Sequence, residues 1–156
     1  MPLEFDERGL LPCGVHDATL EEVEEYFGRF QRTDQRIALC KKLKAYISAL
    51  KSSDINCSLI VDGSFIMTRV DEPEDIDLVL VLPEDWDMDA DLKPYQYNVV
   101  SKKRVRQQYR FDLFAVRKST KDERDWLDFF GQVNVKWCEL FGWPDDLTKG
   151  VVRISI

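Results

Sequence analysis

The segment from Ile76 to Leu82 restricts the fold more than any other part of the chain. It is apolar except for one charged residue, Asp77, and Pro83 ends it. An apolar run of this length is typical of a central β-strand that is covered on both faces. A carboxylate beside such a strand is unfavourable by several kcal/mol unless it is paired or binds a metal ion. The segment therefore predicts a buried sheet. It also predicts that Asp77 is either paired with a cationic side chain or binds a metal ion.

Two further apolar segments also carry or border an acidic residue. Residues 57–62 predict a strand that ends at Gly63, and residues 111–116 predict a strand with Asp112 embedded in it. The alternating pattern of residues 151–156 predicts a closing edge strand. Residues 84–110 are polar and aromatic, and no pattern assigns them to a helix or a strand.

Helices are expected on both sides of these strands in the chain. Thr19 and Glu22 have the spacing of a capping box, and apolar residues then recur at helical intervals as far as Phe30. A second helix, over residues 34–51, carries an apolar stripe of Cys40, Leu43, Ile47 and Leu50. A third begins near Thr120, and its expected buried stripe comprises Trp126, Phe129, Phe130, Val133 and Trp137.

Together these elements predict an α/β fold of the α+β type, with a mixed β-sheet and flanking helices. A chain of 156 residues fits one domain with a real core, so residues 1–156 are expected to form a single domain. Residues 1–16 contain Gly9, Pro12 and Gly14 and are expected to form an irregular N-terminal arm.

Composition limits the location and the classes of partner. No stretch approaches the roughly 18 consecutive apolar residues of a membrane span, and the N-terminus lacks the pattern of a signal peptide. The four cysteines show no paired spacing, which favours free thiols in a reducing compartment. A cytoplasmic protein without a membrane partner is therefore expected.

The charge is negative overall but unevenly distributed. A formal net charge of −7 argues against a general nucleic-acid binder. Acidic residues crowd positions 71–91, whereas Lys102–Arg106 and Arg110 form a basic run. This run is interpreted either as an ordinary solvated face or as a patch for a triphosphate or an RNA acceptor. Nearby tyrosines, Tyr95 and Tyr97 among them, either stack a base or pack against the domain.

Asp75 and Asp77 flank Ile76, so in a strand their side chains share one face. Carboxylates at this spacing can share one divalent ion or hold two, and ligands that are all oxygen favour Mg²⁺ or Mn²⁺. Asp112 lies inside another apolar strand and is expected to join them; its alternative is a pair with Arg110 or Arg117. Gly63 and Ser64 follow the preceding strand, where backbone N–H groups can bind phosphate.

The arrangement Gly63-Ser64, ten residues, Asp75-Ile76-Asp77 resembles the Gly-Ser-x10-Asp-x-Asp motif of minimal nucleotidyltransferases in the polymerase-beta superfamily. Asp112 matches the third carboxylate of that family, which lies on a later strand. The resemblance covers about residues 57–117 and implies a nucleotidyltransferase-like fold. Many members have an arginine directly after Gly-Ser, whereas Phe65 stands here; Arg69 is the candidate for the missing positive charge.

The resemblance implies a Mg²⁺-dependent enzyme that moves a nucleoside monophosphate from a nucleoside triphosphate to a hydroxyl of a protein or RNA. Asp75, Asp77 and Asp112 would bind metal and be catalytic, and Gly63, Ser64 and Arg69 would bind the nucleotide. Small members of the superfamily often act in bacterial toxin–antitoxin or defence pairs. The alternative is a catalytically inactive binding module that keeps the fold and holds a protein partner, as an antitoxin does.

Overall fold

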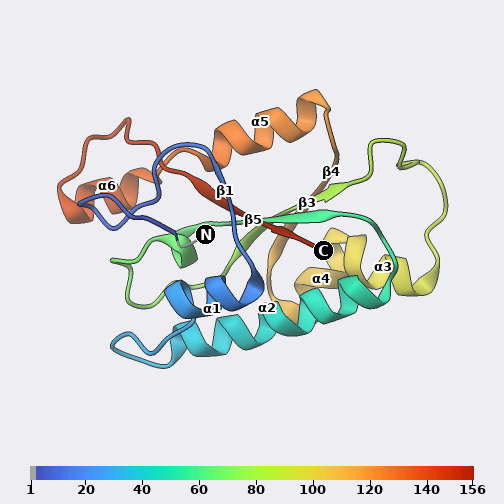
Figure 1. The fold of residues 1–156 in the computed structure, drawn as a ribbon, viewed down its shortest axis with the longest axis horizontal. Helices are drawn as coiled ribbons and strands as arrows, with labels where there is room; N and C mark the ends of the chain where they lie inside the picture. Colours follow the sequence, from blue (N-terminus) through green and yellow to red (C-terminus); the bar gives the residue numbers. More distant parts are fainter. Residues whose placement is uncertain (1–2) are drawn as a thin grey trace.

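The computed structural model describes residues 3–156, which form a mixed five-stranded sheet with helices on both faces (Figure 1). The strands are β1 (Val15–Asp17), β2 (Ser58–Asp62), β3 (Asp77–Leu82), β4 (Asp112–Arg117) and β5 (Val151–Ser155). They lie in the order β1-β5-β2-β3-β4. The two outer pairs, β1 with β5 and β3 with β4, are parallel, and β2 runs antiparallel to both its neighbours. This mixed sheet confirms the predicted α+β class.

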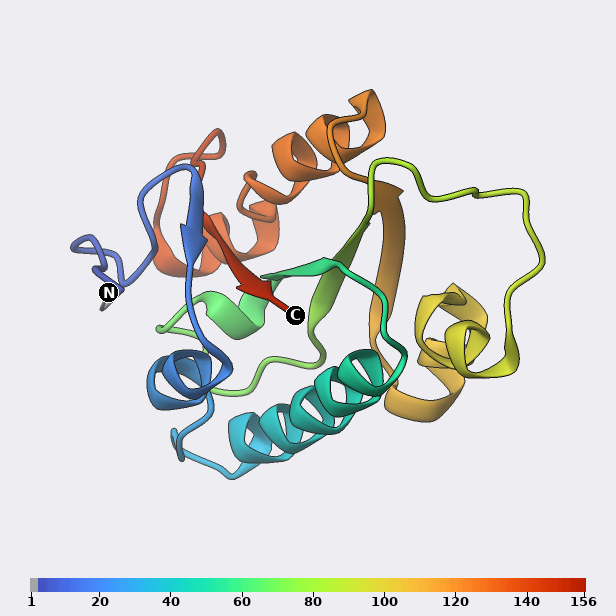
Figure 2. The ribbon, with the colours of Figure 1, turned by 45° about the vertical axis from the view of Figure 1, so that its right-hand side comes forward.

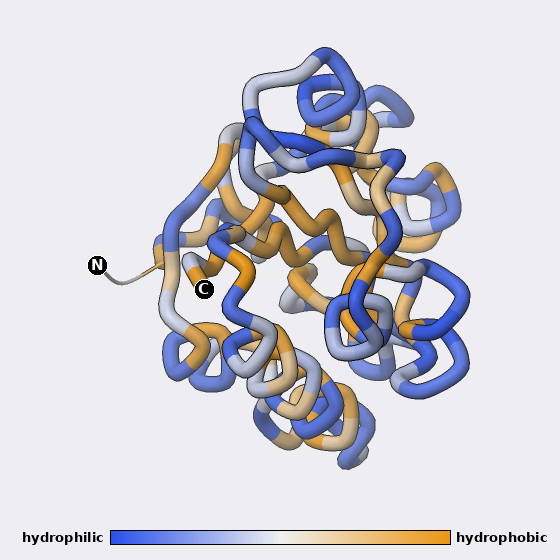
Figure 3. Tube along the Cα trace, turned by 90° about the vertical axis from the view of Figure 1, so that its right-hand side faces the viewer, coloured by the Kyte–Doolittle hydropathy of each residue, from blue (hydrophilic) through white to orange (hydrophobic). Residues whose placement is uncertain are grey.

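Six α-helices and one short 3₁₀-helix are formed by the described residues. They are α1 (Leu20–Phe27), α2 (Gln35–Ser52), η1 (Ser64–Ile66), α3 (Pro94–Val100), α4 (Lys102–Tyr109), α5 (Lys121–Phe130) and α6 (Val135–Phe141). α1 and α2 lie below the sheet in Figure 2, with α3 and α4 beside them, and α5 lies above it. The apolar strands run through the middle of the molecule and hydrophilic segments surround them (Figure 3). No helix in this part of the chain is long and apolar enough to span a membrane.

The first two helices follow the sequence pattern closely. Thr19 and Glu22 form the predicted capping box, in which each side chain accepts a hydrogen bond from the backbone N–H of the other residue. α1 nevertheless ends at Phe27, and Phe30 is exposed. The predicted stripe of α2 is buried in the main core, as are the alternate residues of β2 and β3 that face this helix.

The ends of the sheet differ from the sequence-based expectation. β5 is an inner strand rather than an edge, because β1 pairs with its free side. β1 begins at Val15, so the irregular arm ends at residue 14 and not at residue 16 as predicted. The first two residues of the predicted arm lie outside the described residues. Residues 84–110, which had no assignment, contain α3 and α4. Pro94 opens α3, and the Ser101 hydroxyl caps α4 by accepting a hydrogen bond from the Arg104 N–H.

The third predicted helix is interrupted. α5 ends at Phe130 and α6 begins at Val135, because the segment between them bonds to a later part of the chain. The Lys149 N–H donates to the Gly131 carbonyl over 2.8 Å, and the Val133 N–H donates to the Leu147 carbonyl over 3.0 Å. The single buried stripe is therefore wrong: Phe130 and Val133 are buried, but Phe129 is 58% exposed.

Arg36, in α2, organises the chain between β2 and β3. Its side chain is buried, and its guanidinium donates to the carbonyls of Phe27, Phe65, Met67 and Val70 at distances between 2.5 and 3.1 Å. Burial lowers the pKa of Arg36 to about 10, so it stays charged near neutral pH. These bonds fix the segment that starts at Gly63-Ser64, which would otherwise carry several unsatisfied buried carbonyls.

Arg36→Met is expected to lower the free energy of unfolding by at least about 3 kcal/mol, because it removes several charge-assisted hydrogen bonds from buried carbonyls. Arg29→Met is the control, since Arg29 follows α1, its side chain is 73% exposed, and its ion pair within residues 3–156 is with Glu25. Urea denaturation followed by tryptophan fluorescence measures both. Equal losses in the two variants would contradict the organising role of Arg36.

Candidate functional site

The strand register brings the predicted acidic residues together at one end of the sheet. Asp77 is the cross-strand partner of both Asp62, the last residue of β2, and Asp112, the first residue of β4. Asp75 lies two residues before β3. One carboxylate oxygen from each of Asp75, Asp77 and Asp112 lies within 4.8 Å of the others, and all three side chains are half-buried. The three residues singled out from the sequence thus form one cluster.

Gly63 allows β2 to end against this cluster. Its backbone has φ 84° and ψ −168°, a combination that is essentially restricted to glycine. A β-carbon added at Gly63 would lie 2.7 Å from Asp77 Oδ2, closer than real contacts permit. Ser64 begins η1 directly after it. The predicted turn after a central strand is therefore present, and it is shaped by the side chain of Asp77.

A pocket of about 460 Å³ opens beside the cluster. One wall consists of Gly63, Ser64, Asp75 and Asp77, and the other comes from α5 and α6 with the segment between them, including Phe129 and Trp137. Asp112 is not part of the lining. It contacts Arg106 of α4, the helix that precedes β4.

Crowding of the carboxylates changes their protonation. Burial, and then the charges of Asp75, Asp62 and Asp112, raise the pKa of Asp77 to about 7. The pKa of Asp75 is also raised, first by burial and then by Asp112, while Arg106 acts in the opposite direction. Cations therefore stabilise this group, and its all-oxygen donor set fits Mg²⁺ or Mn²⁺.

A buried ion pair supports the floor of the pocket. Lys149, just before β5, donates to Asp62 and to the Phe130 carbonyl, the latter over 2.9 Å; both charged side chains are 3% exposed. The pKa of Asp62 is still raised, because burial outweighs the favourable effect of Lys149. Sequence analysis missed Lys149. It lies 87 residues from Asp62, and no local pattern marks a lysine that neutralises a distant carboxylate.

Basic residues predicted near the site divide into two groups. Arg106, from the basic run, places Nη1 at 3.4 Å from Asp112 Oδ1 and 3.6 Å from Asp75 Oδ2. Arg69 points elsewhere: it is exposed, donates to the Glu7 carbonyl over 2.5 Å, and does not line the pocket. The structure therefore brings Gly63, Ser64 and the aspartates together, but not Arg69.

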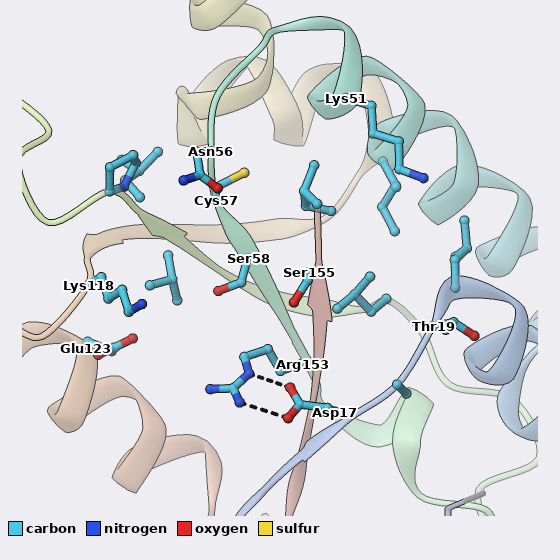
Figure 4. Close-up of a pocket in the computed structure, with 18 of the residues that line it drawn as sticks. Asp17, Thr19, Lys51, Asn56, Cys57, Ser58, Lys118, Glu123, Arg153 and Ser155 are labelled. Carbon is cyan, nitrogen blue, oxygen red and sulfur yellow. Dashed lines mark hydrogen bonds and ion pairs between the residues drawn. The ribbon is translucent and has the colours of Figure 1, made fainter. Parts of the chain in front are cut away.

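A larger hollow, of about 1100 Å³, lies at the opposite end of the strands (Figure 4). Asp17 and Arg153 form a bidentate pair there at 2.6 and 3.0 Å, and Ser58 and Ser155 lie nearby. The hydrogen bond from Arg153 lowers the pKa of Asp17, and burial acts in the opposite direction with a smaller effect. None of the predicted site residues lines this hollow.

Gly63→Ala is expected to destabilise the protein more than Gly142→Ala. Gly142 also has a positive φ, 71°, but a β-carbon added there would meet no heavy atom within 4 Å. We expect a loss of about 1 to 2 kcal/mol at Gly142 and about 3 kcal/mol or more at Gly63, where the clash adds to the backbone strain. Denaturant unfolding measures both. A loss at Gly63 no greater than at Gly142 would contradict the close approach of Asp77.

Asp77→Asn is expected to stabilise the metal-free protein above neutral pH. The folded-state pKa of Asp77, about 7, lies above the ordinary pKa of an aspartate, 3.8, so the folded protein binds the proton more tightly than the unfolded chain. Stability should therefore fall as pH rises from about 4 to about 7. In the variant, the free energy of unfolding should decrease less as the pH rises. At pH 8 the variant should therefore be roughly 1 to 3 kcal/mol more stable than the wild type, after allowance for solvent screening.

Thermal unfolding between pH 5 and pH 8 in a chelator tests this expectation. Asp91→Asn, in the exposed loop after β3, is the matched control for loss of one carboxylate. A large loss of stability in Asp77→Asn at every pH would instead mean that Asp77 is the partner of a buried cation. Within residues 3–156, Asp77 forms no ion pair.

Comparison with curated proteins and with solved structures found no match. Comparison with protein families found a family model that matches nearly the whole chain. Residues 3–155, which include every residue of the aspartate cluster, match the model of a family of unknown function, DUF6932. The chain belongs to that family, DUF6932.

Proposed function

We propose that this protein is a Mg²⁺- or Mn²⁺-dependent nucleotidyltransferase that moves a nucleoside monophosphate from a nucleoside triphosphate to a hydroxyl group. One observation carries the proposal: three carboxylates whose oxygens lie within 4.8 Å stand beside a pocket that begins at Gly63-Ser64. This combination supports the resemblance of the sequence to minimal nucleotidyltransferases. A cytoplasmic location, a protein or RNA acceptor and a role in a toxin–antitoxin or defence pair belong to the same proposal.

The pocket supports a position for the nucleotide. Its floor offers the backbone at Gly63 and Ser64 to phosphates, and its acidic wall holds Asp75 and Asp77. Its opposite wall offers aromatic surface from Phe129 and Trp137, of the kind that packs against a base. Lys136 lines the same wall and supplies positive charge toward a triphosphate.

In the proposed reaction the acceptor oxygen attacks the α-phosphorus, and the bond from that phosphorus to the bridging oxygen of the β-phosphate breaks. Pyrophosphate leaves, and Asp112 accepts the proton of the attacking hydroxyl. The metal, when bound, would offset the negative charge that develops on the phosphates. Asp75 and Asp77 hold it in place, and the rigid end of the sheet fixes the distance between the reacting groups.

A second candidate function is a non-catalytic binding module. The observation that favours it is Arg106, which lies within 3.6 Å of both Asp75 and Asp112 and offsets their charge without a metal ion. Such a module would keep the fold and bind a basic protein partner through its acidic surface. The two candidates differ in whether Mg²⁺ and a triphosphate bind at the aspartates.

Mg-ATP titration and transfer of label from α-phosphate-labelled triphosphates test the proposal. The wild type is expected to bind Mg-ATP and to label itself, RNA or a protein acceptor. Asp77→Asn should weaken Mn²⁺ or Mg²⁺ binding and abolish transfer, because it removes a ligand charge. Asp112→Asn should lower transfer by at least about 100-fold, as loss of a general base does, while Mg-ATP still binds in the pocket.

Asp17→Asn, in the distant hollow, is the control that removes a carboxylate without touching the cluster. A wild-type protein that binds neither Mn²⁺ nor any of the four triphosphates would overturn the enzyme and favour the binding module. Retention of transfer in Asp77→Asn would overturn the assignment of the site.

A further inference from the structure

Residues 93–110 form one of two long stretches of this acidic chain that carry positive charge alone; the other, residues 35–53, contains α2. Six basic residues and no carboxylate lie within 93–110: Lys93, Lys102, Lys103, Arg104, Arg106 and Arg110. All six side chains are exposed. Since the net charge of the chain is −7 and these six residues contribute +6, the residues outside 93–110 carry a formal net charge of −13, so this surface is a basic region on an acidic protein. We refer to α3 and α4 with Lys93 and Arg110 as the basic hairpin.

The basic hairpin is placed beside the aspartate cluster. Arg106 contacts Asp75 and Asp112 at 3.6 and 3.4 Å. One turn earlier on the same side of α4, the Lys102 ammonium lies 4.1 Å from the centre of the Phe114 ring, two residues after Asp112. α4 therefore follows the edge of β4, and its basic side begins at the third carboxylate.

This position lies beside the cluster and outside the lining of the pocket. Asp75 and Asp77 line the pocket, but Asp112 and the basic hairpin do not. In an in-line displacement the entering hydroxyl and the leaving group lie on opposite sides of the phosphorus. If the nucleotide occupies the pocket, the acceptor reaches the cluster from the side of Asp112, across α4.

Exposed aromatic rings are interleaved with the cations. Tyr95 and Tyr97 in α3 are 49% and 45% exposed, and Lys93 lies 6.0 Å from the centre of the Tyr95 ring. Exposed tyrosines among lysines and arginines are typical of surfaces that bind a single strand of nucleic acid, because the cations contact its phosphates and the rings stack on its bases. An acidic protein would use the cations but would not need exposed ring faces.

The acidic loop that precedes the hairpin does not neutralise it. Its five carboxylates lie between residues 84 and 91. The loop leaves the sheet at the end of β3, opposite the end that carries Asp77, and runs outward before it returns to α3 (Figure 2). Its charges therefore lie away from the Arg106 end of α4, where the hairpin meets the cluster.

We propose that the basic hairpin binds single-stranded nucleic acid and presents its terminal hydroxyl to Asp112. The role of the hydroxyl rests on the proposed nucleotidyltransferase function, whereas binding of the strand does not. The acceptor class is thereby narrowed from protein or RNA to a nucleic-acid strand. The negative net charge of the protein disfavours contact with its acidic surfaces, and the contacts of Arg106 with Asp75 and Asp112 place the basic hairpin, unlike the lysines of α2, beside the cluster.

Fluorescence anisotropy with a labelled single-stranded RNA, in a chelator and without nucleotide, tests the proposal independently of catalysis. The triple variant Lys102→Ala, Lys103→Ala, Arg104→Ala should bind at least tenfold more weakly in low salt. The slope of log affinity against log salt should fall by about 2, since each phosphate contact in a single strand contributes about 0.7. Melting temperature should barely change, because the replaced side chains are exposed.

The matched control is Lys41→Ala, Lys42→Ala, Lys51→Ala, which removes the same charge from exposed positions of α2. It should leave affinity and slope near those of the wild type. Tyr95→Ala with Tyr97→Ala should lower RNA affinity at least fivefold without changing the slope, and the corresponding Phe substitutions should restore it.

Absence of RNA binding by the wild type, or equal weakening in the control triple variant, would overturn the proposal. Binding of an acidic peptide, but not RNA, through the same residues would also overturn it, in favour of a protein acceptor. Mg-ATP titration in a separate experiment reports on the nucleotidyltransferase function. RNA binding without Mg-ATP binding would support the nucleic-acid-binding role of the basic hairpin and contradict the proposed nucleotidyltransferase function.

Discussion

Concentration of negative charge at one end of a buried sheet is the constraint on which the rest of this structure depends. Asp62, Asp75, Asp77 and Asp112 meet there because three neighbouring strands begin or end at the same level. Lys149 offsets Asp62, and Arg106 offsets Asp75 and Asp112 from a more exposed position. Asp77 has no such pair among the described residues, and its pKa of about 7 records the cost of leaving it charged. The arrangement persists because the strand pairing and the core fix the backbone, not because the carboxylates attract one another.

The surrounding structure is arranged to hold this end of the sheet open. Arg36 satisfies the carbonyls of Phe65, Met67 and Val70 in the segment after β2, so that segment can leave the sheet with only the short helix η1 in it. Gly63 gives the backbone room to pass the side chain of Asp77. Lys149 ties Asp62 to the end of α5, and the same contacts interrupt the helix between α5 and α6. In a continuous helix the Phe130 carbonyl would accept a hydrogen bond within the helix and would not be free for Lys149. The break in the helix therefore helps to position Lys149, which neutralises Asp62.

Local patterns in the sequence predicted those parts of the fold that local physics determines. The capping box at Thr19, the buried face of α2 and the apolar strand after Asp77 all depend on residues close in the chain. The short β1 depends on a strand more than 130 residues away, and so β5 was expected to be an edge. In the site, the motif spacing located Gly63, Ser64 and the three aspartates. Lys149 could not be found in this way, because its partner is distant, and Arg69 was chosen only to replace a charge that many minimal nucleotidyltransferases carry directly after Gly-Ser.

Arg106 connects the two proposed halves of the site, and magnitudes indicate how it would respond to metal. Its nitrogen lies 3.4 and 3.6 Å from the two carboxylates, longer than an ordinary charge-assisted hydrogen bond, and its side chain is 52% exposed. Exposed pairs of this kind stabilise a protein by about 0 to 1 kcal/mol. A divalent ion carries twice the charge and binds carboxylate oxygens at about 2.1 Å, so in the proposed enzyme it would outcompete the guanidinium at the aspartates. Arg106 would then remain on α4, one turn from Lys102, as part of the surface proposed for the anionic acceptor.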